Sequence, residues 1–549
     1  MLRTSCNTPI IIAMMKAPCD ELAIQSRTAT AYGPTQAGAW ILTAAILGSS
    51  IAFIDSTIVN VALPALQSSL GATVIDVQWV VESYALFLGA LILVGGSIGD
   101  LFGRRRAFLM GVIVFATASA WCGLAPNIHQ LIIARAIQGL GAAFLVPGSL
   151  AIISASFDEK ERGRAIGTWS GATAITTAIG PVLGGWLIQH ASWRWAFFIN
   201  LPLAAAVIVI SLKHVPESES TAEKHVDWLG AAIITVGLGG LVYGLIESAR
   251  LGWRDPLVFA PFAIGVVCLI AFFFVEAWVT EPMVPLQLFQ SRPFSGANLL
   301  TLFLYAAVGI FFFLFPLDLI QVQGYSATAT GAAALPFIVL MSFLSRWSGG
   351  LVARYGARLP LIVGPVITAV GFILFAVPSV GGSYWSTFFP AFIVLGFGMT
   401  VSVAPLTTVV MDAVDQDRAG TASGINNAVA RIAGLLAIAV FGIVMVRSFS
   451  GHLDHSLARL PIPDEQRNEI QSNYVKLAAL EIPPGLDRNT ASEIKASVND
   501  AFVYGFRWIM LICAGLSVVS AAQARWLIPG KPSTHPDLQQ QPRQGSSML

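Results

Sequence analysis

Three ionisable side chains interrupt long apolar runs of this sequence. Asp55 stands in IAFIDSTIVNVALP, Glu82 stands in the next apolar run, and Arg135 stands in LIIARAIQGLGAA. Charged groups inside a membrane are costly, so they usually face the bundle interior and pair with one another. A carboxylate beside an arginine can bind or release a proton when the arginine moves or contacts a substrate. The three residues therefore predict a proton-coupling site.

Depth supports this grouping. Counted from the outer ends of their helices, Asp55 and Arg135 lie roughly seven residues in, or ~10 Å below the surface at 1.5 Å per residue, and Glu82 lies roughly five residues in, at a similar depth. Two structural alternatives stay open. Asp55 and Arg135 also fit a static ion pair that only fixes helix packing, and Glu82 also fits a side chain that reaches the outer membrane surface.

Membrane helices must position these groups. The chain has 549 residues, of which 55% are hydrophobic and 11% are charged, whereas soluble proteins are about 25% charged. A membrane helix needs ~20 apolar residues, and unbroken runs favour helices over the alternating strands of a barrel. The runs that fit lie near 38–62, 77–97, 106–124, 128–154, 164–189, 195–213, 228–247, 256–277, 295–317, 328–350, 360–377, 384–410, 420–446 and 503–528. The sequence therefore predicts an all-α membrane protein with 14 transmembrane helices.

Basic residues orient these helices. With the N-terminus inside, most Lys and Arg residues of the short connections fall on the inner side, and the even number of helices returns the C-terminus there. We therefore expect a multi-pass protein of a bacterial-type cell membrane with both termini cytoplasmic. The expected regions are a cytoplasmic leader (1–37), an N-terminal six-helix half (38–213), an inserted helix pair (214–290), helices nine to thirteen of the C-terminal half (291–447), an extracytoplasmic loop (448–502), helix fourteen (503–530) and a cytoplasmic tail (531–549).

The turn after the second helix recurs eight helices later. It reads GSIGDLFGRRR at 96–106 and GGLVARYGARL at 349–359, which indicates two homologous halves around a central site, a common transporter plan. Glycines permit the tight turn, and an aspartate there can pair with an arginine and lock the inner face shut. Positive-inside topology alone would also explain the arginines. The predicted gate comprises Gly96, Asp100, Gly103, Arg104 and Arg105.

Small residues mark helices four and five. Gln138 and Gly139 share the Arg135 face of helix four, at the i+3 and i+4 positions, and the glycine lets a neighbouring helix approach. A proline in helix five removes a backbone donor and bends the helix. Ordinary small-residue packing is the alternative for both helices. The predicted hinge of helix five comprises Gly180, Pro181, Gly184 and Gly185.

Five further polar residues are candidates for lining a cavity. Asn60 lies in helix one, and Asp318 lies at the outer end of helix nine, where it also fits a simple boundary residue. Asn426, Asn427 and Arg431 are predicted to share a face of helix thirteen.

Other functional classes find no support in the sequence. The net charge of +1 gives no reason to expect a nucleic-acid partner. The five scattered cysteines form no C-x-x-C motif, and neither H-E-x-x-H nor a phosphate loop occurs, which speaks against a metalloenzyme and an ATP-driven pump. We expect no catalytic residues, no metal and no other cofactor, with the proton gradient as the energy source.

Several segments together resemble the major facilitator superfamily, in particular its fourteen-span drug:proton antiporter branch. They follow the branch's order over almost the whole chain, and the resemblance implies two six-helix halves plus two inserted helices. The matching segments are IDSTIVNVALP (54–64), GSIGDLFGRRR (96–106), LIIARAIQGLGAA (131–143), GPVLGG (180–185), WRWAFFINLP (193–202) and DWLG (227–230).

The resemblance also implies residue roles. Asp55 is similar to the helix-one acid of proton coupling, and Arg135 is similar to the arginine thought to face it. The segment 180–185 resembles the hinge associated with exporters, and residues 100–104 resemble the cytoplasmic gate. Ala353 departs from the pattern, because the second-half turn lacks the aspartate, so that half is expected to gate differently. The shared motifs include neither Glu82 nor Asp318, which leaves their coupling roles open.

We therefore expect a proton-coupled secondary transporter that exports small amphipathic or apolar compounds by alternating access. Transport of a natural metabolite on the same fold is one alternative, and a transport-inactive membrane sensor or scaffold is another. The expected partners are a small-molecule substrate, protons and membrane lipid. We expect a monomer, and the outer loop 448–502 is a place where a periplasmic adaptor protein could dock.

Overall fold

The computed structural model describes residues 36–218, 226–279, 282–414 and 418–530. The described chain is helical, and 14 of its helical segments are long and apolar enough to cross a membrane. This confirms the predicted all-α membrane fold. The expected leader, apart from its last two residues, and the expected tail lie outside the described residues.

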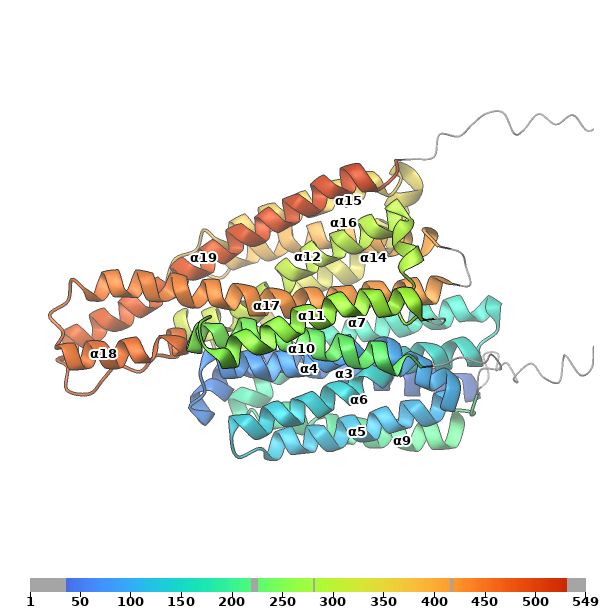
Figure 1. Cartoon of the computed structure of the whole chain (residues 1–549), viewed down its shortest axis with the longest axis horizontal. Helices are drawn as coiled ribbons and strands as arrows, with labels where there is room; N and C mark the ends of the chain where they lie inside the picture. The colour runs from blue at the N-terminus through green and yellow to red at the C-terminus, as the bar shows by residue number, and fades with distance from the viewer. Residues whose placement is uncertain (1–35, 219–225, 280–281, 415–417, 531–549) are drawn as a thin grey trace, which may run out of the picture.

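The first six spans form one bundle, drawn in blue to cyan-green in Figure 1. Within it α3 packs on α6, α7 and α9, while α6 also packs on α4 and α5. Thr73 and Asp76 form a capping box that starts α4, which satisfies two backbone N–H groups at the helix end. The helices are α3 (Gln36–Leu70), α4 (Val74–Phe102), α5 (Arg104–Leu124), α6 (Ile128–Ser156), α7 (Glu159–His190), α8 (Trp195–Phe198) and α9 (Asn200–His214).

The last six spans form a second bundle. Its core includes buried phenylalanines, and the rings of Phe311 and Phe375 lie 4.6 Å apart. The backbone repeats the first bundle at the recurring turn, since Gly103 and Gly356 both have a positive φ, of 101° and 74°. The elements are α12 (Arg292–Leu317), the π-helical turn η2 (Asp318–Val322), α13 (Ala327–Ala333), α14 (Leu335–Tyr355), α15 (Arg358–Phe375), α16 (Phe388–Asp412), α17 (Ala419–Leu457) and α19 (Arg488–Leu527).

Two inserted helices, α10 (Trp228–Leu251) and α11 (Pro256–Trp278), bridge the bundles. They pack on each other, and α10 also packs on α4 of the first bundle and α17 of the second. Figure 1 shows them across the seam between the two bundles. A short 3-10 turn, η1 (Leu286–Gln290), leads from the pair into α12.

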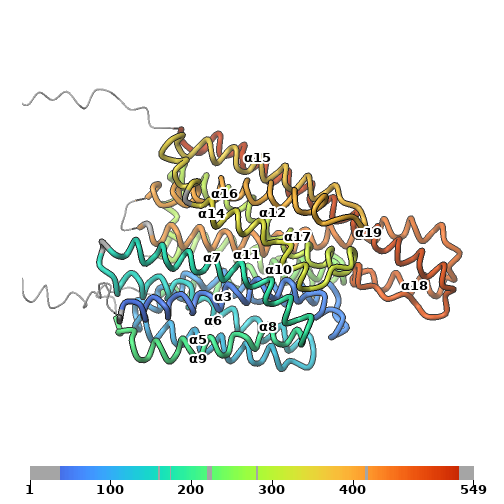
Figure 2. The backbone as a smooth tube through the Cα atoms, turned by 180° about the vertical axis from the view of Figure 1, so that it is seen from behind, coloured from blue at the N-terminus to red at the C-terminus, as the bar shows by residue number. Residues whose placement is uncertain are grey.

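The two ends of the molecule differ. Figure 2 shows that α3 begins and α19 ends at the same end, here called the Arg104 end because the α4–α5 turn lies there. At the opposite end, here called the α18 end, α17 and α19 continue beyond the other helices to carry α18 (Asp464–Ser472) and the 3-10 turn η4 (Tyr474–Ala479).

The segment 448–502, expected as an extracytoplasmic loop, makes up much of the α18 end. That segment is largely helical, because α17 runs on to Leu457 and α19 already begins at Arg488. Hydropathy falls off at 448 and 503, but the helices continue through the polar sequence. Three buried apolar residues, Ile470, Leu477 and Ile494, anchor the connection, so it is a packed structure and not a solvated loop.

Candidate functional site

Asp55 on α3 and Arg135 on α6 form a buried ion pair. Arg135 Nη1 lies 2.5 Å from Asp55 Oδ2, and the two side chains are 0% and 1% exposed. Gln138 Nε2 donates to Asp55 Oδ1 at 2.8 Å, and Gln138 Oε1 accepts from Arg135 Nη1 at 2.7 Å. The structure thus brings together three of the predicted residues in one closed network.

The network extends to two residues that the sequence did not single out. Asn200 Nδ2 donates to Asp55 Oδ1 and to Ser119 Oγ, both at 3.0 Å. Ser119 in turn donates to the carbonyl of Phe197 at 2.9 Å. Asn200 had a signal, because it is one of two polar residues inside WRWAFFINLP, whereas Ser119 had none. Helices α6 and α9 therefore contact the Asp55 carboxylate of α3, and α5 joins the network through Asn200.

Helix α4 completes the surroundings of Arg135. Arg135 Nε donates to the carbonyl of Val80 at 3.0 Å, and its guanidinium lies 4.1 Å from the centroid of the Tyr84 ring. Gly139 makes this approach possible, since a Cβ there would lie 2.5 Å from the Tyr84 carbonyl oxygen. The predicted role of Gly139 in close helix packing agrees with this contact.

Chemically, the network is a switch with two forms. An ionised Asp55 holds Arg135 by charge and accepts hydrogen bonds on both oxygens. A proton on Asp55 removes the charge that retains Arg135, and a moved Arg135 favours protonation of Asp55. The buried pair therefore ties α6 to α3.

Glu82 lies apart from this network, which corrects the prediction that it shares a site with Asp55 and Arg135. Its side chain is 0% exposed, so it does not reach the membrane surface either. Neither carboxylate oxygen has a hydrogen-bond partner among the described residues. The reason is its helical face, because Gln78, one turn earlier, donates to the carbonyl of Ile438 on α17 at 3.1 Å.

The predicted gate residues meet at the Arg104 end. Arg104 Nη2 lies 3.1 Å from Asp100 Oδ1. The acid that organises the turn is Glu217, which the sequence analysis did not select: its Oε1 accepts from the backbone N–H of Arg105 at 3.0 Å. Its Oε2 lies 3.6 Å from Nε of both Arg105 and Arg106.

Two glycines shape this turn. Gly103 has φ +101°, a conformation that favours glycine, and a Cβ there would lie 2.6 Å from Glu217 Oε1. Gly96 lies earlier on α4, beside Pro147 of α6. A Cβ added at Gly96 would lie 3.7 Å from Pro147 Cβ. The turn is therefore packed and cannot accept larger residues at Gly103.

The predicted hinge of α7 lies at the interface between the bundles. A Cβ on Gly184 would lie 2.7 Å from Ile58 of α3, and one on Gly180 would collide with Thr57 of α3. A Cβ on Gly185 would collide with the carbonyl of Ala327 on α13. The carbonyl of Pro181 similarly approaches Gly331 of α13. These small residues let α7 touch both bundles at once.

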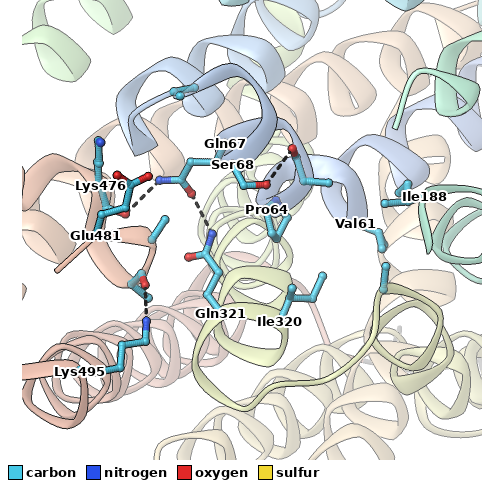
Figure 3. A pocket seen from close by; sticks show the side chains of 16 residues that line it. Val61, Pro64, Gln67, Ser68, Ile188, Ile320, Gln321, Lys476, Glu481 and Lys495 are labelled. Carbon is cyan, nitrogen blue, oxygen red and sulfur yellow. Dashed lines mark hydrogen bonds between the residues drawn. The ribbon is translucent and has the colours of Figure 1, made fainter. Parts of the chain in front are cut away.

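The α18 end is closed by these and further contacts. Thr328 Oγ1 of α13 lies 2.6 Å from Gln189 Oε1 of α7. Gln67 of α3 joins three segments, since it donates to the carbonyl of Lys476 at 3.0 Å and accepts from Gln321 of η2 at 2.9 Å (Figure 3). A cavity of about 450 Å³ remains behind this junction.

The Arg104 end lacks such contacts. Methyl groups added at Gly163, Gly167 and Gly171 of α7, or at Gly349 and Gly350 of α14, would meet nothing within 4 Å. Among the described residues, the close glycine contacts of α7 with the second bundle lie near the α18 end.

The cavity candidates are dispersed. Asn60 is half-buried and makes no side-chain hydrogen bond with the described residues. Asn426 donates to Asn298 at 3.1 Å and to Thr301 at 2.7 Å, both on α12. This corrects the prediction that Asn426 shares a face with Asn427 and Arg431, because adjacent helical residues point in different directions.

Asn427, Arg431 and Asp318 have different environments. Asn427 is exposed and donates to the carbonyl of Ser423 at 3.0 Å. Arg431 is half-buried and has no hydrogen bond or ion pair with the described residues. Asp318 begins the π-helical turn η2 and is 2% exposed, so it is buried and does not line the cavity of Figure 3. Among the described residues no group of three or more His, Cys, Asp or Glu side chains could hold a metal ion.

Comparisons with known proteins agree with this architecture. The chain is 34% identical to "Multidrug resistance protein Stp" of Mycobacterium tuberculosis (strain CDC 1551 / Oshkosh), over 87% of this chain and 90% of that protein. It is 31% identical to the "Tetracenomycin C resistance and export protein" of Streptomyces glaucescens, over 89% of this chain and 92% of that protein.

Solved structures share the fold at low sequence identity. A bacterial homolog of the human lysosomal transporter Spinster, in an inward-facing and unoccupied conformation, superposes with a TM-score of 0.61 at 17% identity, over 90% of this chain and all of that one. The family model described as Major Facilitator Superfamily matches residues 45–438. The chain therefore belongs to the major facilitator superfamily, and its resistance-protein relatives agree with the drug:proton antiporter branch.

Proposed function

We propose that this protein is a proton-driven exporter of small amphipathic or apolar compounds. The observation that carries the proposal is the fully buried Asp55–Arg135 pair, whose charge state and helix positions are linked. Relatives that match along nearly their whole length are named for multidrug resistance and for antibiotic resistance and export, which supports efflux over uptake.

The proposed cycle uses the network as follows. The described conformation is closed at the α18 end, and we assign the Arg104 end to the cytoplasm from the positive-inside bias. A proton that reaches Asp55 from outside neutralises it and frees Arg135, which favours the opening toward the cytoplasm. Release of that proton inside restores the pair. Export results because proton and substrate favour opposite conformations.

The membrane orientation, energy source and partners of the transporter follow from placing the Arg104 end in the cytoplasm. The termini lie on the cytoplasmic side of a bacterial cell membrane, and the energy comes from the proton gradient without a resident cofactor. The chain acts as a monomer, with a periplasmic adaptor at the packed α18 end as an optional partner.

The proposal is tested by substrate-induced proton release in inverted membrane vesicles that hold an acid interior. The panel comprises ethidium, tetraphenylphosphonium, puromycin and tetracycline. We expect at least one compound to dissipate the gradient with the wild type and not with Asp55→Asn. Asp500→Asn is the matched control, because it makes the same change on a side chain that is 68% exposed.

The outcomes separate the alternatives. An equal, non-zero response of wild type and Asp55→Asn makes Asp55 structural and overturns the proposed coupling. No response to any compound, from protein shown to be folded in the membrane, contradicts the export of this class and favours a natural metabolite.

A further inference from the structure

One face of α4 lies along α17, across the seam between the bundles. Gln78 donates to the carbonyl of Ile438, a Cβ on Gly89 would lie 3.5 Å from Arg431 Cβ, and Leu93 lies 2.8 Å from where Gly424 would carry a Cβ. Residues four and seven apart share a helical face. Glu82 is four residues from Gln78 and seven from Gly89, so it belongs to this face of α4.

Two ionisable side chains on this seam, one acid and one base, have no partner among the described residues. Glu82 is 0% exposed and neither of its oxygens has a hydrogen-bond partner among the described residues. Arg431, half-buried on α17, likewise has no hydrogen bond or ion pair there. The hydroxyl of Tyr84, on the next face of α4, is also buried without a partner. Buried polar groups in folded proteins are normally satisfied, so this cluster needs an explanation.

The other charged groups near Glu82 are already occupied. On α10, Glu247 accepts from Trp79 Nε1 at 3.0 Å and lies 2.7 Å from Arg250 Nη2. On α6 and α3, Arg135 and Asp55 satisfy each other.

The remaining titratable group of α10 in this region, Tyr243, packs against the Trp79 ring at 5.8 Å. Arg431 is a half-buried cation of α17 without an ion pair to the described residues, whereas Arg447 of the same helix is exposed.

We propose that Glu82 and Arg431 form a second proton-linked switch, separate from Asp55 and Arg135 and acting between the two bundles. The proposal rests on the proposed function, since it requires the bundles to move. In the described conformation the residues are apart and Glu82 is protonated, because an unpaired buried carboxylate neutralises. In the alternative conformation Arg431 pairs with Glu82, the carboxyl O–H bond breaks, and the proton passes to water.

The geometry allows this exchange. Glu82 and Gly89, the neighbour of Arg431, are separated by seven residues, or ~10 Å along α4 at 1.5 Å per residue. A one-turn displacement of packed helices, ~5.4 Å, together with the length of the arginine side chain, covers that offset. The seam between α4 and α17 moves whenever the two bundles rock. Glu82 then loses and regains a proton as the conformation changes.

Infrared difference spectroscopy of the purified full chain in lipid nanodiscs tests the proposal without a substrate. The measured quantity is the buried carboxyl C=O band as pH is varied. The background is Asp55→Asn with Asp318→Asn, Glu247→Gln and Glu276→Gln, which removes the other buried acids among the described residues. We expect a titrating band that Glu82→Gln abolishes. Arg431→Gln should move its midpoint up by about one pH unit or more, because a nearby cation favours the carboxylate, and Arg431→Lys should restore it.

The infrared experiment has a matched control variant and two results that would overturn the proposal. Arg447→Gln is the matched control, since it removes an arginine from the same helix at the α18 end. The proposal is overturned if Arg431→Gln leaves the midpoint unchanged, or if Glu82→Gln leaves the band. Absence of transport contradicts the proposed function, whereas the infrared result is read independently of it.

Discussion

Asn200 holds Asp55 from the side away from Arg135. Its amide nitrogen lies 3.0 Å from Asp55 Oδ1, while the guanidinium of Arg135 lies 2.5 Å from Oδ2. Both carboxylate oxygens are thus engaged, and the contact ties α9 to α3. A residue outside the predicted set therefore positions the residue on which the proposed function depends.

Replacing Asn200 by alanine should loosen the network without removing its charges. A hydrogen bond to a charged group contributes ~1.5–3 kcal/mol, so the free energy of unfolding should fall by about that amount, and export should weaken but persist. Thermal unfolding in detergent and vesicle flux measure the two effects. Asn427→Ala is the control, because Asn427 is exposed and contacts only a backbone carbonyl. Equal losses in the two variants would contradict the role of Asn200.

The Asp55–Arg135 pair should behave non-additively. Removing one partner of a buried pair leaves an uncompensated charge and costs ~3–5 kcal/mol, whereas removing both often costs far less. Asp55→Asn and Arg135→Gln should each destabilise the protein more than the double variant does. A double-mutant cycle of unfolding free energies measures this coupling, and additive losses would show that the two residues do not interact.

Gly185→Ala should open the α18 end. The added methyl group collides with the Ala327 carbonyl, which separates α7 from α13 and shifts the population toward the outward-open conformation. Distances between spin labels at the exposed residues Ser68 and Ser379 report the change, and longer distances should gain weight. Gly171→Ala is the matched control on the same helix, since its methyl group meets nothing within 4 Å. A shift of equal size in both variants would refute the steric explanation.

Gly103→Ala should damage the turn at the Arg104 end more than backbone strain alone explains. Its φ of +101° disfavours alanine, and the methyl group would also lie 2.6 Å from Glu217 Oε1. Gly252→Ala isolates the strain, because Gly252 has φ +81° and open space around it. Strain at one such residue costs ~1–3 kcal/mol. Gly103→Ala should therefore lower the thermal stability more than Gly252→Ala does. An equal loss would show that the contact with Glu217 adds nothing to the destabilisation.

The sequence predicted most of what depends on hydropathy and helical period. Fourteen spans follow from the length of apolar runs, and Gln138 follows from its i+3 relation to Arg135. Equal depth on neighbouring helices correctly paired Asp55 with Arg135. Depth alone could not place Glu82, because it does not fix the rotation of α4, and that rotation turns Glu82 toward α17.

Other contacts had no local signal at all. Glu217 reaches the α4–α5 turn from a segment more than a hundred residues away along the chain, and Ser119 is an ordinary small residue until α9 is placed against it. The helical continuation of α17 to Leu457 also escaped prediction, since membrane-helix reasoning counts apolar residues and this stretch is polar.

The two long helices at the α18 end can transmit movements of the second bundle to the outside of the membrane. α17 has 39 residues and α19 has 40, or roughly 60 Å each at 1.5 Å per residue, about twice the hydrocarbon thickness of a bilayer. Rods of that length act as levers. A small tilt of the second bundle inside the membrane becomes a large sweep of α18 outside it. A fluorophore on α18 would therefore report each turnover from the aqueous side, far from the substrate path.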